Sequence, residues 1–164
     1  MRACEEPSPR RRPRILVAGL GNLLLRDDGV GVHAVRALRN RVPRGVRAVE
    51  VGTAILDALH LFEWADTILA LDAMQAGGTP GSIYQFGVDD VADHPVPTSL
   101  HELDLRAALR LLMIPPSPTI VVLGVEPEII EAGLTLSSSV QAALPQLVTA
   151  ASNIAARWSA GAQV

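Results

Sequence analysis

The chain has 164 residues and a formal net charge of −3 at pH 7. This length predicts a single domain that buries most of its apolar surface, and the negative charge gives no support for a nucleic-acid-binding protein. No apolar run reaches the roughly 18 residues that a membrane span requires, so we expect no membrane interaction. Hydrophobic residues make up 49% of the chain and aromatic residues only 3%, which predicts an aliphatic core.

The N-terminal segment differs in composition from the rest of the chain. Residues 1–13 carry prolines and clustered arginines, as in a solvated, disordered tail, so we place the folded domain at residues 14–164. The single cysteine, Cys4, lies in this tail and is consistent with a reducing compartment. The arginines precede too short an apolar stretch for a signal peptide. We therefore expect a cytoplasmic protein.

A glycine-rich loop, residues 19–31, connects the first two expected elements. We predict a strand at about Arg14–Gly19 and a helix at about Asp28–Arg41. Asp27 is predicted to cap this helix and Asp28 to lie in its first turn, where the helix dipole favours an anion. Ligands of open α/β sheets bind beyond the carboxyl ends of the strands, so Asp28 is a candidate site residue. A plain strand-to-helix connection is the alternative.

The same loop lacks the signatures of nucleotide binding. A dinucleotide fingerprint requires glycine at position 24, where the chain has Leu24. A P-loop requires a lysine, and all 14 basic residues of this chain are arginines. A generic nucleotide-binding domain is therefore not favoured.

The middle of the chain alternates between strand and helix patterns. We expect a strand at Val46–Val51, a helix at about Ala54–Glu63 and a nearly unbroken apolar strand at Thr67–Leu71. Unbroken apolar runs suit parallel strands that are covered on both faces. Asp72 ends this last strand and should point into the same crevice as Asp28, unless it only caps the following turn.

The next strand is expected at Ser82–Phe86, too close to Asp72 in sequence for a crossover helix, so it should pair antiparallel at an edge. Ser99–Glu102 matches a capping box and opens a helix to about Met113. His101 then lies in the first helical turn, where the dipole favours the neutral ring that a metal ligand requires. A hydrogen-bonded structural histidine is the alternative.

The C-terminal part predicts one more strand and one long helix. The strand is expected at Thr119–Gly124 and the helix at Ser137–Trp158, with Pro145 predicted to kink or break it near Leu144. Strands that alternate with helices, with one antiparallel edge strand, predict a three-layer α/β/α sandwich with a mostly parallel sheet.

Three candidate residues converge by topology. Asp28 follows the first strand, Asp72 ends the third, and His101 opens the helix after the fourth. Two carboxylates and one imidazole form an incomplete set of ligands for a borderline divalent metal. The open positions of such a site can hold an ion that is shared with a partner.

A series of short motifs covers the chain from about Ile15 to Leu147. The motifs are Gly19–Asn22 with Asp27–Gly31, Gly52–Thr53, Leu71–Ala73, Gly77–Gly81, Ser99–His101, Gly124–Pro127 and Gly133–Ser137. In this order and spacing they resemble the maturation endopeptidases of nickel–iron hydrogenases, the proteases that trim the hydrogenase large subunit. Many members of that family have an acidic or glycine-rich lead into Gly-Thr, where this chain has Glu50–Val51, and a glycine soon after it, where this chain has Ala54–Leu56.

The resemblance implies a fold, a substrate and a metal. The fold is a five-stranded twisted sheet between helices, and the nickel-contacting positions are Asp28, Asp72 and His101. The substrate is the nickel-loaded large-subunit precursor, from which a short C-terminal extension is removed. The substrate brings the nickel, which acts as the recognition determinant. We expect metal-assisted hydrolysis by a monomer, with the individual catalytic roles of the three residues left open.

Two other functions compete with this interpretation. Peptidyl-tRNA hydrolases share the Gly19–Asn22 opening, but their further motifs are not found here. A non-catalytic nickel-sensing chaperone of the immature large subunit is a different class, and the sequence excludes it poorly because the peptidase has no separate nucleophile motif.

Overall fold

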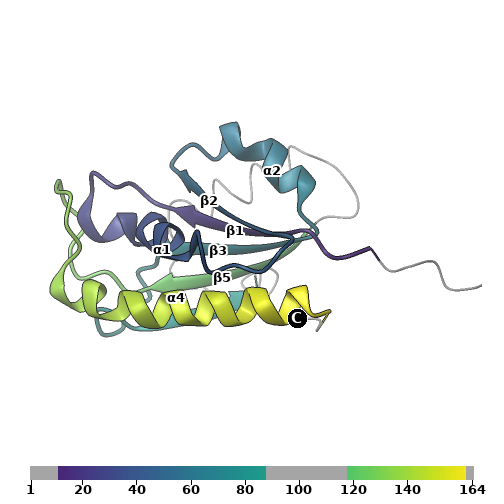
Figure 1. The fold of residues 1–164 in the computed structure, drawn as a ribbon. Coiled ribbons are helices and arrows are strands. Elements are labelled where there is room, and N and C mark those ends of the chain that lie inside the picture. Colours follow the sequence, from purple (N-terminus) through teal and green to yellow (C-terminus); the bar gives the residue numbers. More distant parts are fainter. Residues whose placement is uncertain (1–10, 88–117, 162–164) are drawn as a thin grey trace, which may run out of the picture.

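The computed structural model describes residues 11–87 and 118–161. Within these ranges five strands form one sheet in the order β2-β1-β3-β5-β4 (Figure 1). β4 pairs antiparallel with β5 at the edge, and the other pairs are parallel, which confirms the predicted sheet. The strands are β1 (Ile15–Leu20), β2 (Val46–Gly52), β3 (Thr67–Ala73), β4 (Ile83–Gly87) and β5 (Thr119–Val125).

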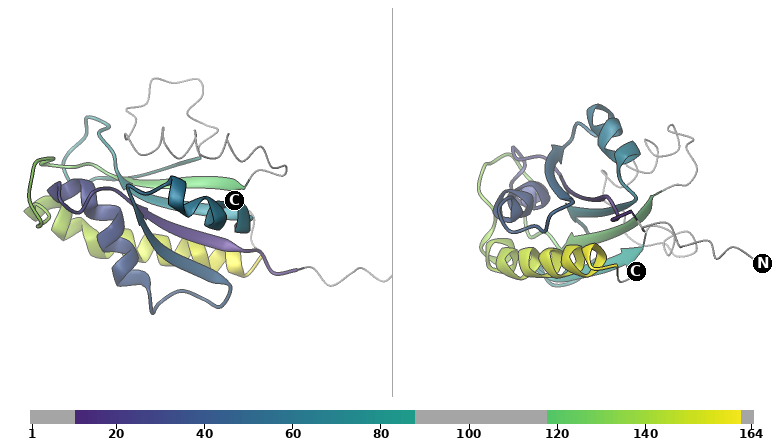
Figure 2. Two further views of the ribbon diagram at one scale, coloured as in Figure 1. Left: turned by 90° about the horizontal axis from the view of Figure 1, so that it is seen from above. Right: turned by 45° about the vertical axis from the view of Figure 1, so that its right-hand side comes forward.

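Helices cover both faces of this sheet, as the predicted three-layer sandwich requires. One face packs against α1 (Val30–Leu38) and α4 (Ser138–Ser159), and the other against α2 (Leu59–Trp64) (Figures 1 and 2). Two short 3₁₀ turns, η1 (Arg26–Gly29) and η2 (Leu56–Ala58), precede α1 and α2. The helix predicted to begin at Ser99 lies outside the described residues. No helix in the described ranges has the length and apolarity to cross a membrane.

β1 has two buried faces because it lies in the interior of the sheet. Ile15 and Val17 belong to the core under α1 and α4, whereas Leu16 and Ala18 belong to the core under α2. Successive side chains of a strand point to opposite faces, so an unbroken apolar run fills both layers. The same reasoning applies to β3, whose apolar run ends at Asp72.

The N-terminus of α1 packs directly on the carboxyl ends of β1 and β3. A Cβ atom at Gly31 would lie 2.0 Å from the carbonyl oxygen of Leu71 and 2.6 Å from that of Leu20. Only glycine permits this approach. The approach brings η1, which carries Asp28, against β3.

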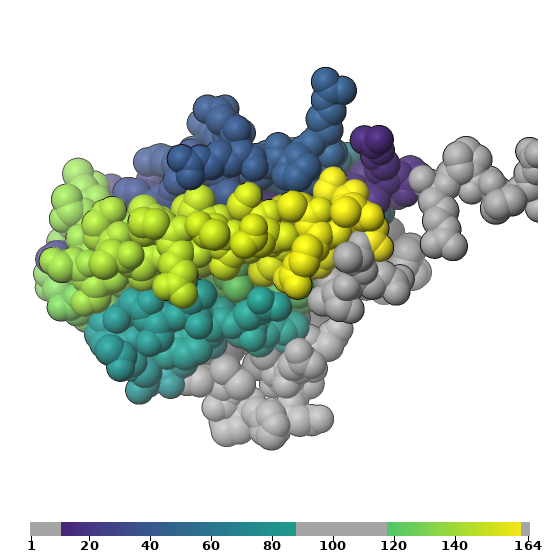
Figure 3. Space-filling model, turned by 60° about the horizontal axis from the view of Figure 1, so that its bottom comes forward, coloured from purple at the N-terminus to yellow at the C-terminus, as the bar shows by residue number. Residues whose placement is uncertain are grey.

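α4 is one continuous helix, so of the kink or break predicted near Leu144 the break is wrong. The exposed side of the helix carries Pro145, and the buried residues Val140, Leu147 and Ala151 hold the helix on the sheet to either side of it. Packing therefore outweighs the backbone hydrogen bond that proline cannot donate. Figure 3 shows α4 along this face of the molecule, beside the segment that contains β4.

Candidate functional site

Two of the three predicted site residues lie at the carboxyl edge of the sheet. Asp28 is half-buried in η1, and its Oδ2 accepts a hydrogen bond of 2.8 Å from the backbone N–H of Asn22. Asp72 is 1% exposed near the end of β3, and its Oδ1 accepts a hydrogen bond of 2.9 Å from the N–H of Ala73. Because η1 packs on β3, the fold brings these two acidic segments together.

His101 lies outside the described residues, so the predicted metal-ligand trio stays a prediction. The described ranges contain no group of three or more metal-ligating His, Cys, Asp or Glu side chains. Asp28 and Asp72 therefore form the described part of the candidate site.

Asp27 is not the helix cap that the sequence suggested. It is fully buried, and its carboxylate accepts hydrogen bonds from three backbone N–H groups of the β5–α4 loop. The Oδ2 atom binds the N–H groups of Glu128 and Ile129, both at 2.9 Å, and Oδ1 binds that of Ser137 at 2.6 Å. Burial raises the pKa of Asp27, whereas these hydrogen bonds lower it. The hydrogen bonds together have the larger effect, so the pKa lies below its ordinary value. Asp27 is therefore an anionic clamp between two loops.

The backbone joins the same two loops. The N–H of Arg26 donates to the carbonyl of Gly133 at 3.0 Å, and the N–H of Gly133 donates to the carbonyl of Leu24 at 2.9 Å. A parallel bridge pairs Leu25 with Gly133. On the surface, Arg26 forms an ion pair of 3.1 Å with Glu131. The loop that carries Asp28 is thus held along its length by residues 128–137.

A second buried carboxylate, Glu126, holds the loop that follows Asp72. Its side chain is 6% exposed and accepts hydrogen bonds from the N–H groups of Ala76, at 2.8 Å, and Gly77, at 3.2 Å. The hydroxyl of Tyr84 donates to the same carboxylate at 3.0 Å. Burial and this bond raise the pKa of Tyr84, so the phenol remains a donor at neutral pH.

Sequence reasoning assigned no role in the site to the clamps Asp27 and Glu126. A signal for Glu126 was available, because an acid directly after a buried parallel strand occupies the same kind of position as Asp72. No comparable signal existed for Asp27, since the pattern of a helix cap also fits it and its partners are about a hundred residues away in the chain.

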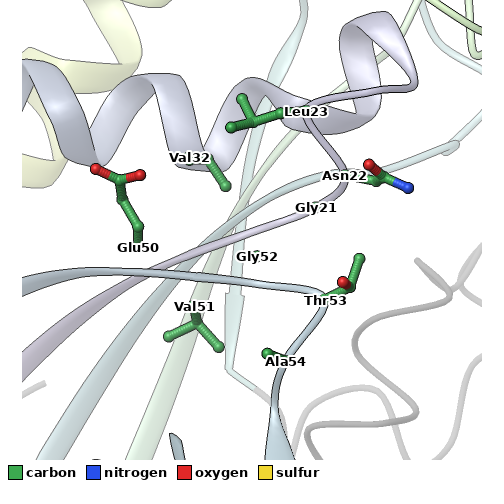
Figure 4. A pocket seen from close by; sticks show the side chains of 9 residues that line it. All are labelled: Gly21, Asn22, Leu23, Val32, Glu50, Val51, Gly52, Thr53 and Ala54. Carbon is green, nitrogen blue, oxygen red and sulfur yellow. The ribbon is translucent and has the colours of Figure 1, made fainter. Parts of the chain in front are cut away.

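A pocket of about 310 Å³ opens beside Asp28, between α1 and the carboxyl end of β2. Figure 4 shows Val32 of α1 directed into it, with Asn22 and Thr53 at the end opposite Glu50. Asn22 lines the pocket and also donates to Asp28, so the pocket and the acidic site share a wall. The full lining is Gly21, Asn22, Leu23, Val32, Glu50, Val51, Gly52, Thr53 and Ala54.

Two arginines pair with Glu50, the acid at one end of the pocket. Arg36 donates to Oε2 of Glu50 from Nε at 3.0 Å and from Nη2 at 2.9 Å, and Arg39 contacts Oε1 at 2.7 Å. The hydrogen bond from Arg36 is the main cause that lowers the pKa of Glu50. Burial and then Arg36 lower the pKa of His33, which favours its neutral form. Glu50 is ionised and paired, and together with its two arginines it leaves one net positive charge at this end of the pocket.

The fold and the acidic edge define a class: an α/β sandwich protein whose candidate ligand site lies at the carboxyl edge of a mostly parallel sheet. Comparison with known proteins gives the family. The family model of hydrogenase maturation protease matches residues 32–154. The chain belongs to this family.

Individual relatives agree with this assignment. The Hydrogenase 2 maturation protease of Escherichia coli is 33% identical over 84% of this chain and 90% of its own length. The hydrogenase expression/formation protein HoxM of Azotobacter vinelandii is 34% identical over 73% of this chain, and the match spans 60% of that protein's length. The structure of the hydrogenase maturating endopeptidase HybD from E. coli superimposes with a TM-score of 0.76 at 29% identity, over 90% of this chain and 94% of that chain.

Proposed function

We propose that the protein is the endopeptidase that removes the C-terminal extension from the nickel-loaded large-subunit precursor of a nickel–iron hydrogenase. The family assignment supports the reaction class. The observation that carries the proposal for this chain is the contact between η1 and β3, which brings the segments of Asp28 and Asp72 to one edge beside a pocket. We propose a cytoplasmic monomer as the working state.

In this proposal Asp28, Asp72 and His101 contact the nickel that arrives in the precursor. Carboxylate and imidazole ligands suit a borderline divalent ion. Such an ion polarises the scissile carbonyl or lowers the pKa of a bound water. That water adds to the carbonyl carbon, the C–N bond breaks, and the released amine takes up a proton. Asp28 or Asp72 would accept the proton from the water.

The pocket beside Asp28 is proposed to receive the chain that is cut. Its walls combine apolar side chains, such as Val32 and Val51, with the backbone around Gly52. An extended segment can make both apolar and main-chain contacts in such a space. Glu50 itself does not repel an acidic segment here, because it is already paired with two arginines.

Trimming of a purified, nickel-loaded precursor tests this function. Intact mass spectrometry should show loss of the extension with the native protein. Asp28→Asn, Asp72→Asn and His101→Ala should each slow trimming by about a hundredfold or more, the scale expected when one electrostatic contributor to catalysis is lost. Nickel-free precursor should not be trimmed.

Matched controls are available on exposed positions outside the pocket lining. Asp57→Asn and His60→Ala change the same side-chain types at exposed sites and should leave the rate unchanged. If the native protein binds the precursor and its nickel but never shortens it, the protein is the non-catalytic chaperone. Full activity of the Asp28→Asn, His101→Ala double variant would contradict the proposed nickel contacts.

A further inference from the structure

Large aliphatic side chains are exposed at one end of the molecule. Among the described residues, the large hydrophobic side chains with high exposure are Leu24 at 64%, Leu56 at 63%, Ile130 at 42% and Leu134 at 70%. All four belong to segments that follow the carboxyl ends of β1, β2 and β5. Leu24, Ile130 and Leu134 belong to the two loops that lie around Asp28, whereas Leu56 lies in η2, apart from these loops.

Three of these residues lie on two loops that backbone hydrogen bonds join, and we call them the leucine rim: Leu24, Ile130 and Leu134. The hydrogen bond from the N–H of Gly133 to the carbonyl of Leu24 places Leu24 next to the segment that carries Leu134. Ile130 follows Ile129, whose N–H binds the buried carboxylate of Asp27. Figure 1 shows the β5–α4 loop projecting at this end of the molecule.

The rim is held in a fixed shape. A fully buried anion and a backbone bridge join its two loops, which is unusual because exposed connections normally have few such restraints. Apolar side chains on a fixed loop lose little conformational entropy when they bind a partner. Clustered exposed apolar residues mark interaction sites, whereas single ones do not.

The rim is also continuous with the candidate site, because Leu24 and Asp28 share one loop. The pocket lining includes Leu23 but none of the three rim residues. A protein substrate whose tail lies in the pocket must therefore place its folded body over the adjacent surface. Arg26 and Glu131 beside the rim form an ion pair with each other, and Glu128 on the same loop is exposed. The three aliphatic side chains themselves favour an apolar partner surface.

We propose that the leucine rim docks the folded body of the protein substrate, through an apolar surface next to the tail that is cut. This inference rests on the proposed function for the identity of the substrate. A second copy of this chain is the competing occupant. Three side chains offer far less area than the about 800 Å² per partner that a stable interface buries, so the rim adds to contacts made by the tail rather than forming a dimer by itself.

The test compares the native protein with the Leu24→Ser, Ile130→Ser, Leu134→Ser triple variant. Biolayer interferometry measures binding of the nickel-loaded precursor, and intact mass spectrometry measures trimming. We expect Kd and KM to rise at least about tenfold with kcat unchanged, because the rim acts in docking and lies outside the acidic site. The urea midpoint should stay near the native value, since exposed substitutions rarely change stability by more than about 0.5 kcal/mol.

Leu56→Ser is the matched control, because Leu56 is as exposed as Leu24 but lies after β2. It should bind the precursor like the native protein. Native-like binding by the triple variant, or an equal loss in Leu56→Ser, overturns the assignment of the rim. A native dimer that the triple variant dissociates in sedimentation also overturns it.

The outcome for the rim is separable from that for the proposed function. If the native protein binds the precursor without trimming it, the proposed peptidase function fails. A loss of binding in the triple variant would then still support the rim. If the native protein trims and the triple variant binds normally, the rim fails and the peptidase stands.

Discussion

Two neighbouring acids, Asp27 and Asp28, have opposite environments. Asp27 has no exposed surface and uses both carboxylate oxygens on backbone N–H groups of a distant loop. Asp28 is half-buried at the edge beside the pocket and accepts a hydrogen bond from Asn22. The two acids therefore have different roles. Asp27 stabilises a loop because its carboxylate accepts hydrogen bonds from buried backbone N–H groups, and the partly exposed Asp28 faces the candidate site.

Asp27→Asn should destabilise the protein by about 3 kcal/mol, because an amide presents its NH₂ group to at least one buried backbone donor. A urea melt measures this loss. Asp57→Asn, at an exposed position, should change stability by less than about 0.5 kcal/mol. Proteolysis of the Asp27 variant under native conditions should begin within residues 128–137, the segment that the carboxylate holds. A native-like melt would show that Asp27 is not a clamp.

At the scale of elements, the contact of α1 with β1 and β3 places the candidate site. The helix approaches so closely that a Cβ atom at Gly31 would overlap the backbone carbonyls of Leu20 and Leu71. Any side chain there pushes the helix away from the strands. Because Asp28 lies in the turn before this helix, its distance from Asp72 depends on the same contact.

Gly31→Ala should therefore lower stability by about 3 kcal/mol or more, the scale of overpacking a tight core position. Trimming should also slow in the fraction that remains folded. Gly77→Ala is the control: nothing lies within 4 Å of a Cβ there, and its φ of +76° adds only about 1–2 kcal/mol of backbone strain. Differential scanning calorimetry of both variants gives the comparison. A smaller loss for Gly31→Ala than for Gly77→Ala would contradict the close-packing argument.

At the scale of the whole molecule, the two ends of the sheet have different surfaces. The carboxyl edge carries the exposed aliphatic residues and the acidic site. At the other end, Asp66 accepts hydrogen bonds from the backbone N–H of Arg14 at 2.7 Å and from the side chain of Arg11 at 2.9 Å. Arg47 stacks 4.0 Å from the ring centroid of Trp64 there. This difference between the two ends of the sheet directs an apolar partner to the carboxyl edge.

Stability should fall as the solution becomes acidic. Asp27, Glu50 and Asp66 all have a pKa below the ordinary value of about 4. Between these lowered pKa values and about pH 4, the unfolded chain binds more protons than the folded protein does. The three carboxylates therefore stabilise the folded protein fully above about pH 4, and this stabilisation is lost as the pH falls below it. His33 acts in the same direction below about pH 6.5, because burial lowers its pKa in the folded protein.

Urea midpoints between pH 7 and pH 3 test this dependence. The midpoint should decline slightly below about pH 6.5 and steeply below about pH 4. Replacing His33 with glutamine should remove the first decline and leave the second. A midpoint that is constant or higher at pH 3 would show that the lowered pKa values do not contribute to stability.

Local patterns predicted most of the architecture. The double-faced burial of β3 follows from its unbroken apolar run, and the antiparallel edge position of β4 follows from the short connection after Asp72. Two local rules failed, because tertiary contacts outweighed them. Packing on both sides of Pro145 keeps α4 continuous, and a distant loop uses the carboxylate of Asp27 that a helix cap would have used.

The sequence by itself determined the order of strands and helices, the placement of Asp28 and Asp72 at strand ends, and the motifs that indicate the family. These properties depend on residue type and spacing, which are local. Only the tertiary structure decided that Asp27 and Glu126 hold the loops around the site, and that the loop of Leu24 is joined to the loop of Leu134. Such contacts join residues about fifty to a hundred positions apart, and no local pattern encodes which distant backbone groups a buried carboxylate will meet.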